Sequence, residues 1–310
     1  MNRLSQTVAA CLFLISLPAA AMIITPAVEE IARQAPFIVK GTLLPDLRLQ
    51  IEHQYKGEIP EETISIPDLA PLNDVVNGQW EDTTYRVRAL RVRLEQPAYD
   101  QLKGNGLIGH TLVVFLEKAD EGDTYNLKGS KRFPPEPNRK HAAVKMISGN
   151  AVLGFFQIRS DGPLRLVLDR NTPTPEALEA AIRYDRPLRL TLGHSSPRQK
   201  GVVINRFYFT LINLSDELVP LDLPENMTLT IKGHAFEEET ELPDDLWDRR
   251  DFRDILEPGR MIYTHYVLSE LDPEAFPLEK GKAYEGTLTI RTIRDGEEET
   301  YSATTEAKIR

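Results

Sequence analysis

The sequence predicts a mainly β protein, and two observations lead to this class. Apolar and polar residues alternate along short stretches such as residues 47–55, and short unbroken apolar runs occur, as in residues 112–116. Turn sequences such as Asp295-Gly296 separate these stretches. With 310 residues, 41% of them hydrophobic, the chain is long enough for two domains with separate buried cores. We therefore expect two β domains joined by a short linker.

Residues 1–21 have the features of a cleavable signal peptide. Arg3 supplies positive charge, residues 8–17 are apolar, and small residues precede Met22. Cys11, the one cysteine in the sequence, lies in this segment, and most of the apolar run follows it, which argues against a lipid-modified cysteine. We expect a mature chain that begins near Met22, lacks cysteines and membrane-spanning segments, and works in the periplasm or outside the cell.

Residues 23–192 are predicted to form the first domain. A helix over residues 25–35 opens it, and a second helix, capped by Thr174 and begun by Pro175, precedes a last strand over residues 188–192. The other strand-like stretches are residues 37–43, 47–55, 63–67, 85–94, 112–116, 124–129, 152–158 and 164–168. The polar residues 193–200 are expected to be the linker to the second domain.

The order of these elements resembles that of exported bacterial domains of the netrin/TIMP-like OB-barrel type. The resemblance covers residues 37–183 and rests on a strand ending Tyr55-Lys56-Gly57, the strand over residues 113–116, the Tyr125 hairpin and the closing helix near residues 178–182. It implies an OB-like barrel with flanking helices that binds another molecule, often a protein. Animal inhibitors of this superfamily ligate a protease zinc ion through an N-terminal cysteine. This chain has no equivalent, so that activity is not implied.

Residues 201–310 are predicted to form the second domain. A long strand over residues 202–213 opens it. Short strands follow at the spacing of a sandwich, over residues 218–223, 227–233, 260–268, 284–294 and 300–309. Residues 209–216, the turn at 256–259 and residues 280–284 resemble recurring features of bacterial Ig-like sandwiches, including proteinase-inhibitor-like ones. The predicted architecture is therefore an OB-like barrel with flanking helices, followed by an Ig-like β-sandwich.

The sequence contains no recognisable catalytic, metal or cofactor motif. We find no His-Glu-x-x-His sequence, P-loop, nucleophile elbow or EF-hand loop. His194 lies beside Ser195 and Ser196, but in the expected linker, and the other histidines are scattered singly. We therefore predict no catalytic residue, no metal ligand and no cofactor. The formal charge of −10 disfavours a nucleic-acid partner.

A basic, Pro-rich loop in an otherwise acidic chain is the first candidate partner-binding surface. Residues 131–141 include Arg132, Arg139 and Lys140, whose charge suits an acidic partner or the acidic loop of the second domain. The simpler interpretation is a stiff, exposed connector, because three prolines lie in the same segment.

The second candidate surface is an acidic loop over residues 236–254, which also contains Trp247, Arg249 and Arg250. Trp and Arg are common anchors of protein interfaces, and clustered carboxylates suit a weakly bound divalent cation. The simpler interpretation is a solvated insertion whose arginines balance its own acids.

These observations together predict an exported, non-enzymatic binding or assembly module whose ligand is a protein. Two alternatives stay open. A protease inhibitor would present an exposed, rigid loop to a protease cleft. A hydrolase with an unrecognised site would bring His, an acid and Ser or Tyr together in a pocket.

Overall fold

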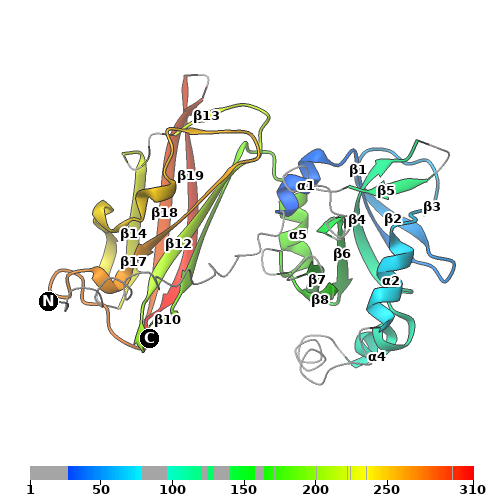
Figure 1. Cartoon of the computed structure of the whole chain (residues 1–310), viewed down its shortest axis with the longest axis horizontal. Helices are drawn as coiled ribbons and strands as arrows, with labels where there is room; N and C mark the ends of the chain where they lie inside the picture. Colours follow the sequence, from blue (N-terminus) through cyan, green and yellow to red (C-terminus); the bar gives the residue numbers. More distant parts are fainter. Residues whose placement is uncertain are drawn as a thin grey trace, which may run out of the picture. The chain divides into compact units, whose positions relative to one another are not determined.

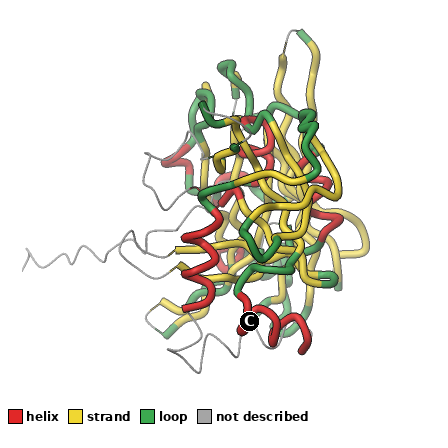
Figure 2. The backbone as a smooth tube through the Cα atoms, turned by 90° about the vertical axis from the view of Figure 1, so that its right-hand side faces the viewer, coloured by secondary structure: helices red, strands yellow, loops and turns green. Residues whose placement is uncertain are grey.

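The computed structural model of the chain describes residues 27–78, 96–120, 124–128, 140, 142–157, 164–169, 172–199, 201–221, 223, 225–234, 236–294 and 296–310. The predicted signal peptide, the predicted strand over residues 85–94, Arg132 and Arg139 lie outside the described residues. The chain is mainly β, as predicted, and strands form most of its regular structure (Figures 1 and 2). It divides into two compact units, Met1–Ile182 and Arg183–Arg310.

The first unit is built on an antiparallel sheet with the strand order β3-β2-β1-β4-β6-β7-β8, and β5 also pairs with β4. The strands are β1 (Phe37–Leu43), β2 (Arg48–Lys56), β3 (Thr63–Ser65), β4 (Thr111–Lys118), β5 (Tyr125–Leu127), β6 (Val144–Ser148), β7 (Ala151–Gln157) and β8 (Leu164–Leu168). Residues 112–116 are fully buried in β4, which confirms the prediction of a core strand there.

One edge of β4 has two neighbours. β6 pairs with the N-terminal half of β4, and β5 pairs with its C-terminal half. A parallel bridge joins Ser65, the last residue of β3, to Thr124, just before β5. The strand path β3-β2-β1-β4-β5 therefore returns to β3.

The described helices of this unit are α1 (Val28–Gln34), α2 (Leu69–Gly78), α4 (Gln96–Asn105) and α5 (Pro175–Ile182). In the chain, α2 and α4 lie between β3 and β4, whereas α1 and α5 pack side by side (Figure 1). The predicted cap of the last helix is confirmed, because the main-chain N–H of Ala177 donates to Thr174 Oγ1 at 3.3 Å.

The pair Lys56-Gly57 connects the end of β2 to α1. Lys56 Nζ donates to the main-chain oxygens of Ala32 at 2.9 Å and Arg33 at 3.0 Å, where a cation is favoured by the helix C-terminus. Gly57 has a φ of +72°, and a Cβ there would lie 2.6 Å from the main-chain oxygen of Pro36. Hydrogen bonds to the end of α1 thus explain the lysine at position 56, and close backbone packing explains the glycine at position 57.

The second unit has two main antiparallel sheets, ordered β17-β12-β9 and β15-β14-β18-β19. Their strands are β9 (Leu188–Ser195), β12 (Arg206–Asn213), β14 (Met227–Gly233), β15 (Phe236–Glu241), β17 (Met261–Val267), β18 (Ala283–Arg294) and β19 (Glu297–Lys308). Two short ribbons pair β10 (Arg198–Gln199) with β11 (Val202–Val203) and β13 (Val219–Pro220) with β16 (Ile255–Leu256). Single 3₁₀ turns are η2 (Asp244–Leu246), η3 (Arg249–Asp251) and η4 (Leu268–Glu270).

The predicted domain boundary lies too late in the chain. Residues 188–192, expected as the last strand of the first domain, and residues 193–195 of the expected linker form β9. β9 pairs along its whole length with β12, so it belongs to the second unit, which begins at Arg183. The alternating pattern identified a strand correctly but contains no information on its partner.

Aromatic side chains fill the core of the second unit. The largest buried ones are Phe207, Phe209, Trp247, Tyr266, Tyr284 and Tyr301. The predicted turn between the last two strands is confirmed, since Arg294 of β18 lies opposite Glu297 of β19 and Gly296 between them has a φ of +83°. The long β18–β19 hairpin formed by this turn contains the last two strands of the unit.

Candidate functional site

Trp247, expected as an interface anchor, is a core residue. It is 5% exposed, and its ring meets those of Phe209 and Tyr266 edge to face, with centroid distances of 5.3 and 5.1 Å. The main chain at Trp247 also forms a β-bridge to Tyr266. Residues 236–241 of the segment expected as an acidic loop form β15, so only the rest of it is a loop. Burial of Trp247 holds that loop in place, and this side chain offers little surface to a partner.

Arg249 and Arg250 are exposed, but each pairs with an acid of its own loop. Arg249 Nη2 lies 3.2 Å from Asp244 Oδ2, and Arg250 Nε donates to Asp248 Oδ1 at 2.8 Å. The hydrogen bonds from Arg250 lower the pKa of Asp248 to about 2. The described residues include no group of three or more His, Cys, Asp or Glu placed to hold a metal ion. The arginines of this loop therefore balance its own acids.

Lys140, from the basic loop, also has a partner in its own unit. Its Nζ lies 3.2 Å from Asp68 Oδ2, which in turn accepts a hydrogen bond from the main-chain N–H of Leu127 at 2.9 Å. Each candidate partner-binding residue that the structure describes thus interacts within its own unit.

His194 and Ser196, two positions apart in the sequence, also lie close together in the structure. Ser196 Oγ is 3.4 Å from His194 Nε2 and donates to Asn205 Oδ1 at 2.8 Å. Burial, together with the nearby positive charge of Arg310, lowers the pKa of His194. Ser196 thus helps to position Asn205, which directly precedes β12.

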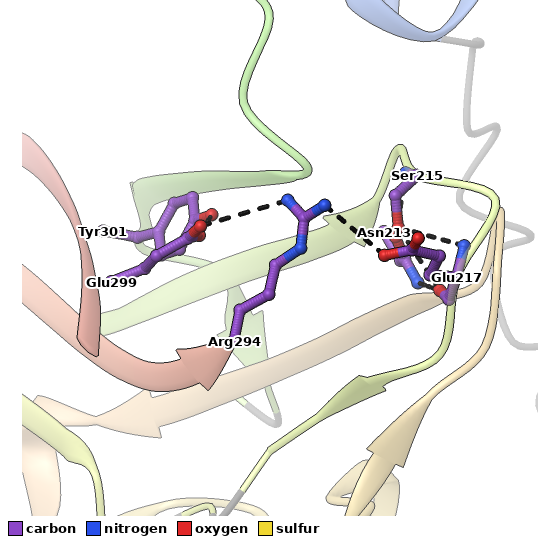
Figure 3. A network of polar contacts seen from close by, with 6 residues as sticks. All are labelled: Asn213, Ser215, Glu217, Arg294, Glu299 and Tyr301. Carbon is purple, nitrogen blue, oxygen red and sulfur yellow. Dashed lines mark hydrogen bonds and ion pairs between the residues drawn. The ribbon is translucent and has the colours of Figure 1, made fainter. Parts of the chain in front are cut away.

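A second asparagine, Asn213, organises the turn at the other end of β12 (Figure 3). It is fully buried, and its Nδ2 donates to the main-chain oxygens of Glu217 at 2.7 Å and Leu256 at 2.9 Å. Its Oδ1 accepts from the N–H of Ser215 at 2.9 Å and from the Ser215 hydroxyl at 2.7 Å. The amide therefore ties the turn after β12 to β16. The sequence signal for this arrangement is an Asn two residues before a Ser.

Arg294, at the end of β18, connects this turn to the β18–β19 hairpin (Figure 3). Its Nη2 lies 3.4 Å from Glu217 Oε2, and its Nη1 lies 3.9 Å from Glu299 Oε1. Glu299 also accepts a hydrogen bond from the hydroxyl of Tyr301. One cation thus bridges two segments that are far apart in the sequence.

Exposed apolar side chains occur on the elements that meet at this end of the second unit. Of the four large hydrophobic residues exposed in the described part of the chain, three are Leu218 (61%), Ile255 (50%) and Ile293 (64%). Leu218 directly precedes β13, which pairs with β16, the strand of Ile255. Thr292 Oγ1 donates to the main-chain oxygen of Pro220 in β13 at 2.8 Å, so the inner face of β18 meets β13, whereas Ile293, the next residue, points to the opposite face of β18. We call these three residues the hairpin-end patch.

Sequence reasoning missed the hairpin-end patch because each member alternates with buried neighbours and so resembles an ordinary strand residue. No protein-family model matches the chain, and no curated protein matches it in sequence. Within the described ranges, no helix has the length and apolar character needed to cross a bilayer. The structure alone therefore supports the candidate site. Two of its exposed apolar side chains, Leu218 and Ile293, lie next in the sequence to the ion-paired residues Glu217 and Arg294.

Proposed function

We propose that this chain is an exported, non-enzymatic binding protein that acts by holding another protein. The hairpin-end patch carries the proposal, because three of the four large apolar side chains exposed on the described residues lie on elements that meet at this end of the unit, and exposed apolar surface concentrated in one region is typical of interaction sites. Asn213 and Arg294 fix the elements beneath it, so a partner would meet a surface that is already ordered. Glu217 and Arg294 give it a charged rim of the kind that surrounds protein interfaces.

The proposal includes two finer fold assignments. The closed strand path β3-β2-β1-β4-β5 of the first unit, with helices between β3 and β4, supports an OB-like barrel. The sheet orders of the second unit support an Ig-like sandwich, in which β9, β12 and β17 would correspond to strands A, B and E, and β15, β14, β18 and β19 to C′, C, F and G. A fold alone does not define a ligand, so the patch remains the argument for function.

Export is the part of the proposal that depends on residues 1–21. Cell fractionation followed by N-terminal sequencing tests it, with a periplasmic or secreted protein that begins near Met22 as the expected result. A cytoplasmic protein that keeps its first residues would contradict export but would leave the binding surface untouched.

The binding function is tested by placing charges on the patch. The mature chain, immobilised and exposed to periplasmic extract with brief crosslinking, is compared with the triple variant Leu218→Asp/Ile255→Asp/Ile293→Asp. Since the three side chains already face solvent, the folded unit should tolerate the change, which circular dichroism checks. We expect partners captured by the unmodified chain to be lost by the variant, because buried unpaired charges oppose association.

Ala283→Asp is the matched control. Ala283 is an exposed apolar residue that begins β18, at the opposite end of that strand from Ile293. This variant should capture the same partners as the unmodified chain. If the triple variant, correctly folded, retains all partners, or if Ala283→Asp removes them equally, the assignment of the patch is wrong.

A protease inhibitor is the second candidate, and the β10–β11 ribbon is the observation that favours it. Arg198, Gln199 and Val202 are all exposed there, while the N–H of Ile204 donates to the main-chain oxygen of Pro197 at 2.9 Å and closes the ribbon. A short, hydrogen-bonded hairpin of this kind suits insertion into a cleft. Inhibition assays over a panel of serine proteases, with Arg198→Ala as the comparison, test this candidate. Inhibition that survives Arg198→Ala, or no inhibition at all, contradicts it.

A further inference from the structure

The sheet β17-β12-β9 has one face in the core and one face turned outward. Even-numbered residues over 206–210 of β12 and odd-numbered residues over 261–267 of β17 are half-buried, whereas the residues between them are buried. The register places Tyr208 opposite His265, and Tyr263 lies on the same face of β17 as His265. Two tyrosines and a histidine therefore share the outward face.

The ring of Tyr208 lies along this face. Gly193 of β9 is opposite Tyr208 in the register, and a Cβ at Gly193 would lie 2.5 Å from Oη of Tyr208. The ring therefore leans from β12 over the main chain of β9, where only a glycine leaves room for it. Tyr263 extends the aromatic surface, because its ring centroid lies 6.1 Å from that of Tyr208, with an angle of 42° between the ring planes.

Polar groups beside the two rings have hydrogen-bonding capacity to spare. Among the residues that the structure describes, neither the hydroxyl of Tyr208 nor that of Tyr263 has a hydrogen-bond partner. Arg206, the preceding outward residue of β12, donates from Nε to Ser195 Oγ at 3.1 Å and forms no ion pair within the described ranges. Its Nη groups are therefore available as donors to a ligand.

Positive and negative charges around His265 are balanced. Burial lowers the pKa of His265, the charges of Arg206 and Arg250 lower it further, and those of Asp248 and Glu270 raise it. The imidazole is therefore neutral at pH 7 and can both donate and accept a hydrogen bond. Asp248 and Arg250 already pair with each other, since Arg250 Nε donates to Asp248 Oδ1 at 2.8 Å. With two cations and two acids at this place, the face favours a neutral ligand over a strongly charged one.

Aromatic rings that lie on a sheet beside spare donors and acceptors suit a sugar. A pyranose ring has C–H groups on its faces, which the electron-rich face of a phenol ring attracts, and hydroxyl groups around its edge. A protein partner would gain most from large exposed apolar side chains. None of the four that the described residues expose lies on β9, β12 or β17.

We infer that the outward face of the sheet β17-β12-β9 binds a neutral glycan. A pyranose ring stacks on Tyr208 and Tyr263, and its hydroxyl groups form hydrogen bonds with Arg206 and His265. This goes beyond the proposed function, because it adds a ligand of another chemical class on a face that shares no residue with the hairpin-end patch.

The test uses the full mature chain and four oligosaccharides as probes. Cellohexaose, chitohexaose and maltohexaose are neutral, whereas hexagalacturonate carries a carboxylate on every ring. Calorimetry measures the affinity, and ¹³C-labelled tyrosine rings, observed by NMR, report the site. We expect at least one neutral probe to bind and to shift the ring signals of Tyr208 and Tyr263, and the acidic probe to bind no more tightly.

Variants of the face separate the ring surface from the donors. Tyr208→Ala and Tyr263→Ala should each weaken binding about tenfold, because they remove the stacking surface. Gly193→Ala should weaken binding with both rings still present, because its methyl group displaces the ring of Tyr208. Arg206→Gln should weaken binding about threefold through the loss of hydrogen bonds. Tyr55→Ala, which removes a half-buried tyrosine of β2 in the first unit, is the matched control and should leave the affinity unchanged.

Each variant is checked for folding by circular dichroism, and the two tyrosine variants are independent, so one that fails to fold leaves the other to decide. Four outcomes would overturn the inference. No neutral probe binds; binding is unchanged in a folded tyrosine variant; or hexagalacturonate binds most tightly and loses affinity in high salt, which would make the face an anion site. The fourth is that Tyr208→Ala loses a protein captured from periplasmic extract while no glycan binds, which would assign the face to a protein. The triple variant of the hairpin-end patch tests the proposed function independently, so the two proposals fail separately.

Discussion

The two ends of β12 are each organised by a buried asparagine, yet they present different surfaces. Asn213 makes four side-chain hydrogen bonds, three of them within its own turn and one to Leu256. Asn205 makes three, and two of them reach Arg310, which is 105 residues away in the sequence. Exposed apolar side chains lie on the elements around the Asn213 end, whereas a pocket of about 190 Å³ lies beside Asn205.

This difference shows that the same side chain can build two kinds of surface. At Asn213 the amide replaces backbone partners that a tight turn lacks, so its removal leaves several buried polar groups unsatisfied. At Asn205 the amide bonds the main chain of Arg310 at a partly buried position, where water can replace it more readily. Loss of Asn213 should therefore lower the free energy of unfolding of the second unit more than loss of Asn205.

The largest expected effect is that of Asn213→Ala. Four hydrogen bonds are lost, three of them buried ones to Ser215 and Leu256, so we expect the free energy of unfolding of the second unit to fall by about 3 kcal/mol. Urea unfolding followed by Trp247 fluorescence measures this in a Trp80→Phe background, since these are the two tryptophans of the chain. Ser215→Ala, which removes one hydroxyl, should cost about 1 kcal/mol. A loss for Asn213→Ala no larger than that of Ser215→Ala would show that the amide does not hold the turn.

Asn205→Ala should have a smaller effect, about 1.5 kcal/mol by the same measurement, because its bonds to Arg310 are long and only partly buried. The variant should also speed hydrogen exchange at the main-chain N–H of Arg310, which Asn213→Ala should not. If Asn205→Ala destabilises the unit as strongly as Asn213→Ala, the contrast between the two ends disappears.

Arg294→Gln should change stability by about 0.5 kcal/mol, because both its ion pairs lie near the surface. Salt screens such pairs, so the difference between the variant and the unmodified chain should fall at high ionic strength. Glu217→Gln, which removes one of the two partners, provides the comparison and should cost less. An effect of Arg294→Gln that is large and independent of salt would mean that Arg294 supports the hairpin end by packing and not by charge.

The smallest effect is the part of the pH dependence that comes from His194, near the Asn205 end. The pKa of His194 is lowered by burial and by Arg310, so the folded unit binds fewer protons than the unfolded chain below the ordinary value of 6.5. The contribution of His194 to stability is therefore complete above pH 6.5 and declines as the pH falls through the lowered value. Unfolding at neutral pH and at about pH 5, compared between the unmodified chain and His194→Gln, measures it. A pH dependence identical in both proteins contradicts the assignment.

Local sequence signals predicted those parts of the fold that depend on neighbouring residues. The Thr174 cap, the Asp295-Gly296 turn and the buried run over residues 112–116 are all visible in short windows, and all three are confirmed. The partner of residues 188–192 is not visible in such a window. The strand pattern was correct there, but assignment to the first unit was wrong, because pairing with β12 is a long-range choice.

The candidate site was beyond prediction for the same reason. Trp247 sits among charged residues in the sequence and so resembled an exposed anchor, but Phe209 and Tyr266 bury its ring. Leu218, Ile255 and Ile293 look like ordinary strand residues until the β13–β16 ribbon meets the end of β18.

By itself, the amino-acid sequence determined that this chain is mainly β and where its short turns and helix caps lie, because those depend on residues a few positions apart. The tertiary structure alone decided which strands pair, which aromatic ring is buried and which apolar side chains stay exposed. These features depend on which distant segments pack against one another. Hydrophobic burial stabilises any packing that covers apolar surface, so the local sequence pattern does not specify the packing partner.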